Sequence, residues 1–210
     1  YMHRDIFNIA EKYGKDTFLT IEKLGTDVMP KLFAVKGRTD ATLNKLPVLP
    51  KFLSDRVMQG VSSLFPQHLP DRVLEFRDRY EHHLILKMSE GGIAEARAFL
   101  PEFFADTNNA GAYFECTPQE ASKAFLQRIA AAGAEIRYQT LFSDQVGEML
   151  ALDIALRRND ADWVEELPEH IRSQIEHTLY YGHFICHVFH QDYILKKGAD
   201  AKAVKKAMLV

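Results

Sequence analysis

A run of aromatic, β-branched and histidine side chains at residues 180–195 constrains the fold more than any other part of the sequence. It reads YYGHFICHVFHQDYIL. Branched and aromatic side chains fit a pleated, half-buried surface, so the run predicts a strand, and a helix is the weaker alternative. On one continuous strand His183 and His187 share a face and His190 lies on the other, unless a bulge re-aims one of them. A helix would instead bring all three histidines to one side.

These three histidines are the densest group of proton-active side chains in the sequence. They could accept protons, bind a carboxylate or hold a metal ion, or they could be hydrogen-bonded and inert inside a buried strand. A metal site has little support, because there is no His-Glu-x-x-His pattern and the adjacent pair His82-His83 would face opposite sides of a strand. We therefore assign no metal ligand, and a metal-dependent enzyme built on His183, His187 and His190 is kept as a rival hypothesis.

The composition and the absence of common motifs exclude several classes of protein. The 210 residues carry a net charge of -3 and two cysteines, which predicts no nucleic-acid partner, no disulfide framework and no thiolate zinc site. No apolar run approaches the roughly 20 residues that span a bilayer, so we expect any membrane contact to be peripheral. P-loop, Gly-x-Gly-x-x-Gly and Gly-x-Ser-x-Gly motifs are absent. The chain starts without an initiator methionine and stops inside a helical pattern, which indicates a segment of a longer protein.

Residues 1–79 are predicted to be mainly helical, with a local excess of positive charge. Helical patterns cover residues 3–13 and 51–65, and residues 16–24 fit either a helix or a strand. Cations are interleaved with apolar side chains here, which suits a segment that lies on anionic lipid, although a solvated helical face would look similar. The candidate membrane-binding cations are Lys31, Lys36, Arg38, Lys45, Lys51, Arg56, Arg72 and Arg77.

Residues 80–210 alternate between strand and helix patterns. Strands are predicted at 80–88, 112–116, 135–141 and 180–195, and helices at 93–104, 117–132, 144–158 and from residue 199 onward. The helix at 117–132 opens with a capping box formed by Thr117 and Glu120. This order of elements predicts an α+β fold, in which an antiparallel sheet is covered by helices and preceded by the basic, mainly helical segment.

Two further side chains are candidates for holding a carboxylate. Arg157 lies at the end of the helix predicted at 144–158, where its guanidinium could bind a carboxylate bidentately. A cation at a helix C-terminus is also favourable without any ligand. Tyr181 could donate a hydrogen bond to a carboxylate or an alkoxide, but a half-buried strand tyrosine needs no ligand.

Six stretches resemble one enzyme family, and together they extend over nearly the whole chain. They are residues 5–23, 36–41, 80–84, 122–126, 150–160 and 180–197. These stretches are similar to the respiratory, quinone-dependent D-lactate dehydrogenases of bacteria, which are flavoenzymes of the vanillyl-alcohol-oxidase-like family. The resemblance implies a membrane-binding region at 1–79, a cap domain at 80–210, and a flavin domain outside this chain. It also makes the helix at 117–132 a candidate part of the membrane-facing surface.

The resemblance implies oxidation of D-lactate to pyruvate, with hydride passed to FAD and electrons passed on to membrane quinone. FAD would be bound mainly by the flavin domain, so no cofactor-binding residue is assigned here and the segment alone is expected to be inactive. The other implied partners are the flavin domain and an anionic phospholipid surface at the cytoplasmic face of the bacterial inner membrane. The rival hypothesis from another class is an interaction module that binds lipid or protein and does no chemistry.

More distant relatives, such as the D-subunit of glycolate oxidase, carry a Gly-His-x-Gly-Asp-Gly-Asn-x-His run beside the substrate. Its Gly-His start and its last histidine are kept here at His183 and His190, whereas its glycine-rich centre is replaced. By this resemblance His183 and His190 are the candidate catalytic residues. Their neighbours His187 and Tyr181 are assigned to substrate binding. The same relatives have a Trp-x-x-Arg whose arginine faces the substrate carboxylate, and Arg157 stands at a comparable place.

Overall fold

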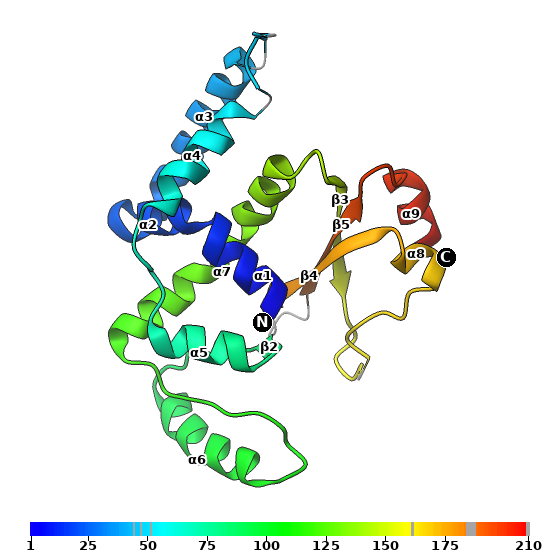
Figure 1. The fold of residues 1–210 in the computed structure, drawn as a ribbon. Helices are drawn as coiled ribbons and strands as arrows, with labels where there is room; N and C mark the ends of the chain where they lie inside the picture. The colour runs from blue at the N-terminus through cyan, green and yellow to red at the C-terminus, as the bar shows by residue number, and fades with distance from the viewer. Residues whose placement is uncertain (44, 47, 51, 161, 184–187, 209–210) are drawn as a thin grey trace.

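A five-stranded antiparallel sheet forms the centre of the structure, a computed structural model that describes residues 1–210 except 44, 47, 51, 161, 184–187 and 209–210 (Figure 1). The strands follow the order β2-β1-β4-β5-β3 across the sheet. Their bounds are β1 Met2–His3, β2 His82–His83, β3 Val146–Ala155, β4 Ile175–His183 and β5 Val188–Lys196. The helices are α1 Arg4–Tyr13, α2 Lys15–Leu24, η1 Thr26–Val28, α3 Met29–Leu43, α4 Leu53–Ser63, α5 Asp71–Arg79, α6 Gly91–Ala105, α7 Pro118–Leu141, α8 Glu169–Arg172 and α9 Ala201–Met208. The predicted α+β class is confirmed.

The histidine-rich run belongs to two strands, so the prediction of one continuous strand at 180–195 was wrong. β4 and β5 pair antiparallel as a hairpin, and residues 184–187, which include His187, lie outside the described residues. In the register Tyr181 faces His190 and His183 faces Val188. Directly paired residues share a face of a sheet. His183 and His190 therefore lie on the same face, not on opposite faces as one strand would place them.

Gly182 allows the two strands of this hairpin to approach closely. A Cβ atom at this position would collide with the backbone carbonyl oxygen of Val188 and crowd the Cα of Phe189. Backbone atoms of a paired strand cannot move aside as the end of a flexible side chain can. The glycine next to His183 is therefore required by packing, since any larger residue would push the hairpin apart.

Two regular elements have the opposite type from the prediction. The helix expected at 144–158 is β3, which pairs with β5 along nearly its whole length. The strand expected at 135–141 is the last part of α7, which runs past Gly133 to Leu141 instead of ending at 132. Of the strand expected at 80–88 only β2 is formed, and residues 112–116 are irregular. The capping box of Thr117 and Glu120 at the start of α7 is confirmed.

Helices cover both faces of the sheet. On one face, α1 and α7 pack together and bury Ile6, Ala130 and Ala134 against Leu179 and Ile194 of the hairpin. On the other face, α8 and α9 cover a smaller core that contains Tyr193 and Leu195. The first helix of the chain is thus part of the same core as the sheet. The division into residues 1–79 and 80–210 stays a prediction.

Two projections leave this compact body. The arm, residues 25–66, is built mainly of α3 and α4, which run side by side away from the body at the top of Figure 1. The lobe, residues 84–113, contains α6 and hangs below α5 at the bottom of that view. Neither α3 nor α6 contains a buried residue. Both projections therefore expose side chains that the body would bury.

His68 lies in the segment that leads from the arm back to α5, and it is only 2% exposed. Its ring packs 4.3 Å from the ring of Phe18, measured between centroids. Neither ring nitrogen makes a hydrogen bond of normal geometry among the described residues, although Gln127 faces the ring. Burial lowers the pKa of His68 below its ordinary value of 6.5. The charged side chains that face it are Glu11 of α1, Lys15 of α2 and Lys123 of α7.

This burial predicts a loss of stability when the pH falls below about 6.5. There the unfolded chain protonates His68 while the folded chain does not, so acid favours unfolding. The pKa of Glu135 is raised, which acts in the opposite direction over the same range, so the comparison must be between variants. We expect the difference in unfolding free energy between the native chain and His68→Leu to change by at most about 1.4 kcal/mol per pH unit between pH 7 and 5. A difference that is independent of pH would contradict this assignment.

Candidate functional site

A row of polar side chains crosses three strands on the face of the sheet that α1 and α7 cover. Asp153 of β3 pairs with His190 of β5, and His190 pairs with Tyr181 of β4. The Nδ1 atom of His190 lies 2.5 Å from Oδ1 of Asp153. The ring of His190 also lies 4.8 Å from the ring of Tyr181 and 6.2 Å from that of His183, between centroids. The structure therefore brings together three of the residues that the sequence singled out.

The contact with Asp153 decides which nitrogen of His190 is available. An ionised carboxylate only accepts hydrogen bonds, so Nδ1 carries the hydrogen and donates it to Asp153. The lone pair of the neutral ring is then on Nε2. A carboxylate partner on one nitrogen orients the ring and fixes which nitrogen carries the hydrogen. His190 is thus arranged as a proton acceptor, and Asp153 is the residue that positions it.

Two buried carboxyl groups, those of Glu135 and Asp192, contact the hydroxyl of Tyr181 in this row. The hydroxyl of Tyr181 lies 2.9 Å from Oδ2 of Asp192 and 3.1 Å from Oε1 of Glu135. Glu135 is 4% exposed and Asp192 is 3% exposed. Burial, and then the nearby charge of Asp192, raise the pKa of Glu135 to about 9. Glu135 is therefore protonated at neutral pH, and the hydrogen-bonded group holds Tyr181 under the ring of His190.

Arg157 does not join this row. It follows β3 instead of ending a helix, two residues beyond Ala155, which pairs with Val188 at the same end of the sheet as His183. Its side chain is 91% exposed, and its Nε lies 3.3 Å from Oδ1 of Asp160. The backbone N–H of Arg157 also donates to Asp160, at 2.8 Å. The residue is at the expected end of the sheet, but it is engaged in a local turn.

The cations that the sequence marked for lipid fall into two groups. Lys31, Arg38 and Lys45 of the arm are exposed. Arg56 is also exposed, at 3.9 Å from Asp144. The others are paired with anions: Lys36 with Asp40 and Asp55 of the arm itself, Arg72 with Glu120, and Arg77 with Glu11 and Asp78. Lys51 lies outside the described residues.

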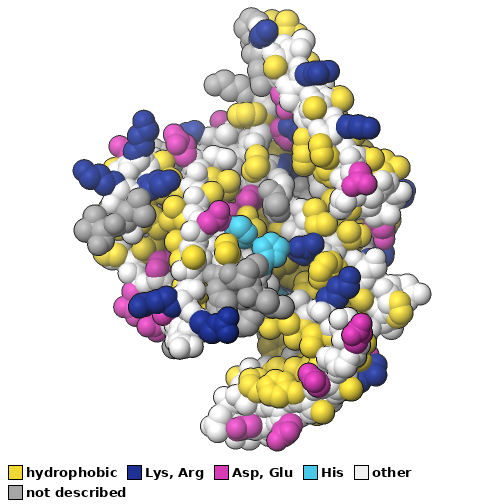
Figure 2. Space-filling model, turned by 180° about the vertical axis from the view of Figure 1, so that it is seen from behind, with side chains coloured by type: hydrophobic (Ala, Val, Ile, Leu, Met, Phe, Trp, Pro, Cys, Tyr) yellow, Lys and Arg dark blue, Asp and Glu magenta, His cyan; other side chains and the backbone are white. Residues whose placement is uncertain are grey.

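Figure 2 shows how charge is distributed on one side of the molecule. Dark blue cations stand among yellow apolar side chains along the arm, whereas the lobe at the bottom combines apolar and acidic side chains. By sequence the arm has six cations against three anions, hence a net charge of +3. The lobe has two cations against four anions, hence -2. The two projections are therefore electrostatically different.

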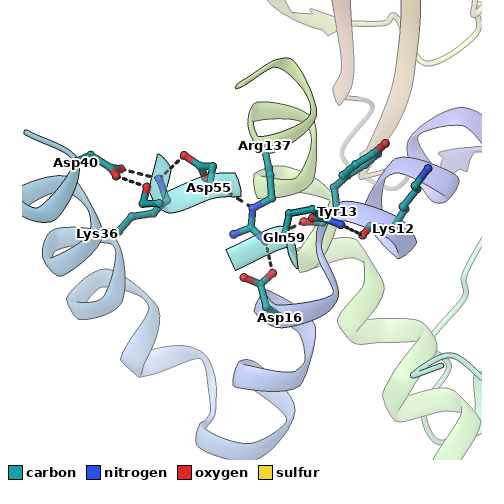
Figure 3. Close-up of polar contacts among 9 residues, drawn as sticks. Lys12, Tyr13, Asp16, Lys36, Asp40, Asp55, Gln59 and Arg137 are labelled. Carbon is teal, nitrogen blue, oxygen red and sulfur yellow. Dashed lines mark hydrogen bonds and ion pairs between the residues drawn. The ribbon is translucent and has the colours of Figure 1, made fainter. Parts of the chain in front are cut away.

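A buried ion-pair network fastens the arm to the body (Figure 3). Arg137 of α7 donates from Nη1 to Asp16 of α2 and to the carbonyl oxygen of Tyr13, and its Nε lies 3.7 Å from Asp55 of α4. Asp55 in turn accepts a 2.9 Å hydrogen bond from Lys36 of α3. Arg137 and Asp55 are each 7% exposed. Arg137 of the body thus contacts both α2, the helix that leads into the arm, and α4, a helix of the arm itself.

The residues described here offer little to a phosphate-bearing cofactor or a metal. The helix that lies against the row, α7, begins with Thr117 and Pro118 instead of a glycine-rich loop, and its N-terminal N–H of Glu120 is capped by Thr117. A dinucleotide diphosphate therefore finds no cradle at that end. Among the described residues, no cluster of three or more His, Cys, Asp or Glu could bind a metal ion. Within the same part of the chain, no helix has the length and apolar character needed to cross a membrane.

Comparison with known proteins gives one consistent result. A family model described as "D-lactate dehydrogenase, membrane binding" matches residues 1–210. The chain is 60% identical over 209 residues to a quinone-dependent D-lactate dehydrogenase of Escherichia coli (strain K12), covering 100% of this chain and 36% of that protein. A protein of the same description from Haemophilus influenzae is 52% identical over 209 residues, 37% of its length, and one from Corynebacterium glutamicum is 42% identical over 204 residues, 36% of its length. The chain thus spans just over a third of these relatives.

Proposed function

Because the chain belongs to the family of D-lactate dehydrogenase membrane-binding regions, we propose that it attaches a quinone-dependent D-lactate dehydrogenase to the membrane and covers its substrate. The family match over all 210 residues is the observation that carries the proposal. In this proposal the arm and the sheet have different roles. The arm is the contact with the lipid surface, and the sheet presents its polar row to the substrate.

The arm suits an anionic phospholipid surface. Lys31, Arg38 and Lys45 project from it into solvent, next to exposed apolar side chains such as Phe33 and Val48. Cations near the surface of a membrane are attracted by anionic headgroups, while apolar neighbours enter the boundary of the acyl chains. Attachment of this kind is peripheral, and we place it at the cytoplasmic face of the bacterial inner membrane.

The polar row suits the oxidation of D-lactate to pyruvate. In this reaction C2 loses a hydride and the hydroxyl group loses a proton. FAD, bound mainly by the part of the full-length enzyme outside this chain, would supply the hydride acceptor, and quinone would be the final acceptor of the electrons. His190 takes the hydroxyl proton on Nε2, because Asp153 occupies its Nδ1. His183 stands beside it as the second candidate base.

The substrate carboxylate requires a cation at the same end of the sheet. Arg157 is the candidate, and it would have to exchange Asp160 for the substrate. Tyr181 supports the row, since its hydroxyl is held by Asp192 and its ring contacts His190. The proposed contact of His187 with substrate falls outside the described residues.

Membrane attachment through the arm can be tested by co-sedimentation of the full-length protein with vesicles. We expect the triple variant Lys31→Glu, Arg38→Glu, Lys45→Glu to bind anionic vesicles about 100-fold more weakly at low salt, since each cation near the surface contributes about 1 kcal/mol. Raising the salt concentration should weaken native binding toward the same level. The matched control reverses three exposed lysines of α9, Lys202, Lys205 and Lys206, and should bind as the native protein does. Equal losses in both variants would show a general effect of net charge and refute the arm as the contact.

A further inference from the structure

The ring of Tyr181 lies against the ring of His190. The two residues are paired in the register of β4 and β5, so both side chains stand on the same face of the sheet. Their ring centroids are 4.8 Å apart, and the ring planes are inclined by 32°. Rings side by side in one plane would need a larger separation, and an edge contact would have steeper planes. The face of Tyr181 is therefore turned toward the imidazole.

The hydroxyl of Tyr181 is bound to buried carboxyl groups. It donates a 2.9 Å hydrogen bond to Oδ2 of Asp192 and lies 3.1 Å from Oε1 of Glu135. Burial, and then the charge of these two groups, raise the pKa of Tyr181, so its hydroxyl stays protonated. The hydroxyl is thus engaged within the protein, and it is the ring that Tyr181 presents to His190.

The ring of Tyr181 is electron-rich because of this hydrogen bond. The raised pKa of Glu135 keeps that group protonated at neutral pH, so the negative charge lies on Asp192. A phenol that donates to a carboxylate is polarised, and part of the charge moves into its ring. Asp192 is buried, so little water screens this effect. The face next to His190 is therefore suited to a positive charge.

His190 gains such a charge in the proposed reaction. As the O–H bond of D-lactate breaks, an N–H bond forms at Nε2 while Nδ1 still donates to Asp153, and the hydride leaves C2 for the flavin of the full-length enzyme. An aromatic face attracts a cation within about 6 Å of its centroid, whereas a neutral imidazole carries no charge to attract. The contact with Tyr181 thus strengthens as the proton is transferred, and only interactions that strengthen in this way accelerate a step.

We propose that Tyr181 is a positioning residue of the reaction, whose ring face stabilises the protonated ring of His190 and whose hydroxyl is held in place by Asp192 and Glu135. This inference rests on the proposed role of His190 as the base. It gives Tyr181 an effect that is exerted through His190 instead of through the substrate.

The test compares three forms of the full-length enzyme that carry at position 181 phenylalanine, a singly fluorinated phenylalanine or a triply fluorinated one. Fluorine withdraws electrons from the ring face while the shape hardly changes, and all three forms lack the hydroxyl. We expect the rate of flavin reduction by saturating D-lactate in a single turnover to fall stepwise, reaching about 10-fold below Tyr181→Phe. The KM for D-lactate should stay unchanged. A ring that only fills space would give equal rates, which would refute the proposal.

Two controls accompany this series. The same three replacements at Tyr138, whose hydroxyl lies 2.8 Å from Nε2 of His177 and not in the row, should have equal rates. In the His190→Ala background the series at position 181 should also be flat, because no imidazolium forms. If loss of the hydroxyl prevents folding, tyrosine and a difluorinated tyrosine give the same comparison with the hydroxyl kept.

Failure of this inference and failure of the proposed base are distinguishable. If His190→Ala is inactive and the fluorinated series is flat in the otherwise native enzyme, the base stands and the role of Tyr181 is refuted. If His190→Ala reduces its flavin as fast as the native enzyme, the proposed base is refuted, and the role of Tyr181 with it.

Discussion

Arg137→Met is expected to destabilise the fold by about 3–5 kcal/mol, the usual cost of removing one partner from a buried ion pair. The methionine fills a similar volume but leaves Asp16 without its main partner and Asp55 with Lys36 alone. Asp55 is 7% exposed, so water cannot replace the lost guanidinium. A drop in the urea midpoint with an unchanged slope would measure the effect.

The control for this prediction is Arg56→Met on the same arm. Arg56 is exposed and lies 3.9 Å from Asp144, whose side chain is 90% exposed. Exposed pairs of this kind contribute little, so we expect a change within about 0.5 kcal/mol. Because Arg137 joins α7 to α2 and α4, its loss should also make the arm more sensitive to limited proteolysis. Equal stabilities of the two variants would show that the network does not hold the arm.

His190→Ala is expected to lower kcat for D-lactate oxidation by the full-length enzyme by about 10²–10⁴-fold, the usual contribution of a general base. The hydroxyl proton would then have no acceptor at the place where Nε2 stands. Asp153→Asn should reduce kcat less, since the ring of His190 remains but loses the carboxylate that positions it. The anionic-vesicle binding of both variants should stay unchanged, because the row lies on the sheet and not on the arm.

The control for the base is His170→Ala on α8. This histidine is exposed and precedes β4, at the opposite end of that strand from His183. It should have no effect on kcat. If His190→Ala remains active while His183→Ala does not, the role of base passes to His183. If both variants remain active, proton transfer does not depend on this hairpin.

Local signals in the sequence were sufficient where the backbone itself needs a partner. The capping box of Thr117 and Glu120 predicted the start of α7, and the helical pattern at residues 3–13 predicted α1, which ends at Gly14. Both positions satisfy backbone groups that a helix end leaves without partners. Such signals lie within a few residues of the groups they serve, so they can be read without the fold.

Tertiary pairing overrode propensity in two other segments. Val146–Ala155 contains Glu, Met, Leu and Ala, which favour a helix, yet it forms a strand because β5 offers a partner along its length. Residues 135–141 contain Ile, Tyr and Thr, which favour a strand, yet α7 continues through them. There Glu135 and Arg137 find buried partners on other elements. Neither partner is near in the sequence.

The residues of the candidate site could likewise be recognised from the sequence only in part. His183 and His190 stand out because they lie in one dense run, and the hairpin does bring their rings together. Asp153 and Glu135 could not be recognised, because they reach the row from 37 and 46 residues away and nothing in their local sequence differs from an ordinary carboxylate. The break of the run into two strands also could not be read from the pattern, because the need for glycine at 182 arises only from the close approach of Val188 on the paired strand.

Two residues of α7 that are only two positions apart contact different parts of the molecule. Glu135 turns toward the hairpin and Arg137 toward the foot of the arm, since residues two apart on a helix point to nearly opposite sides. A single inserted or deleted residue between them would rotate one relative to the other by about 100° and leave one partner unmet. An insertion at this point of the chain would therefore break one of the two contacts. An arm transplanted to another enzyme would need the last turns of α7 to go with it.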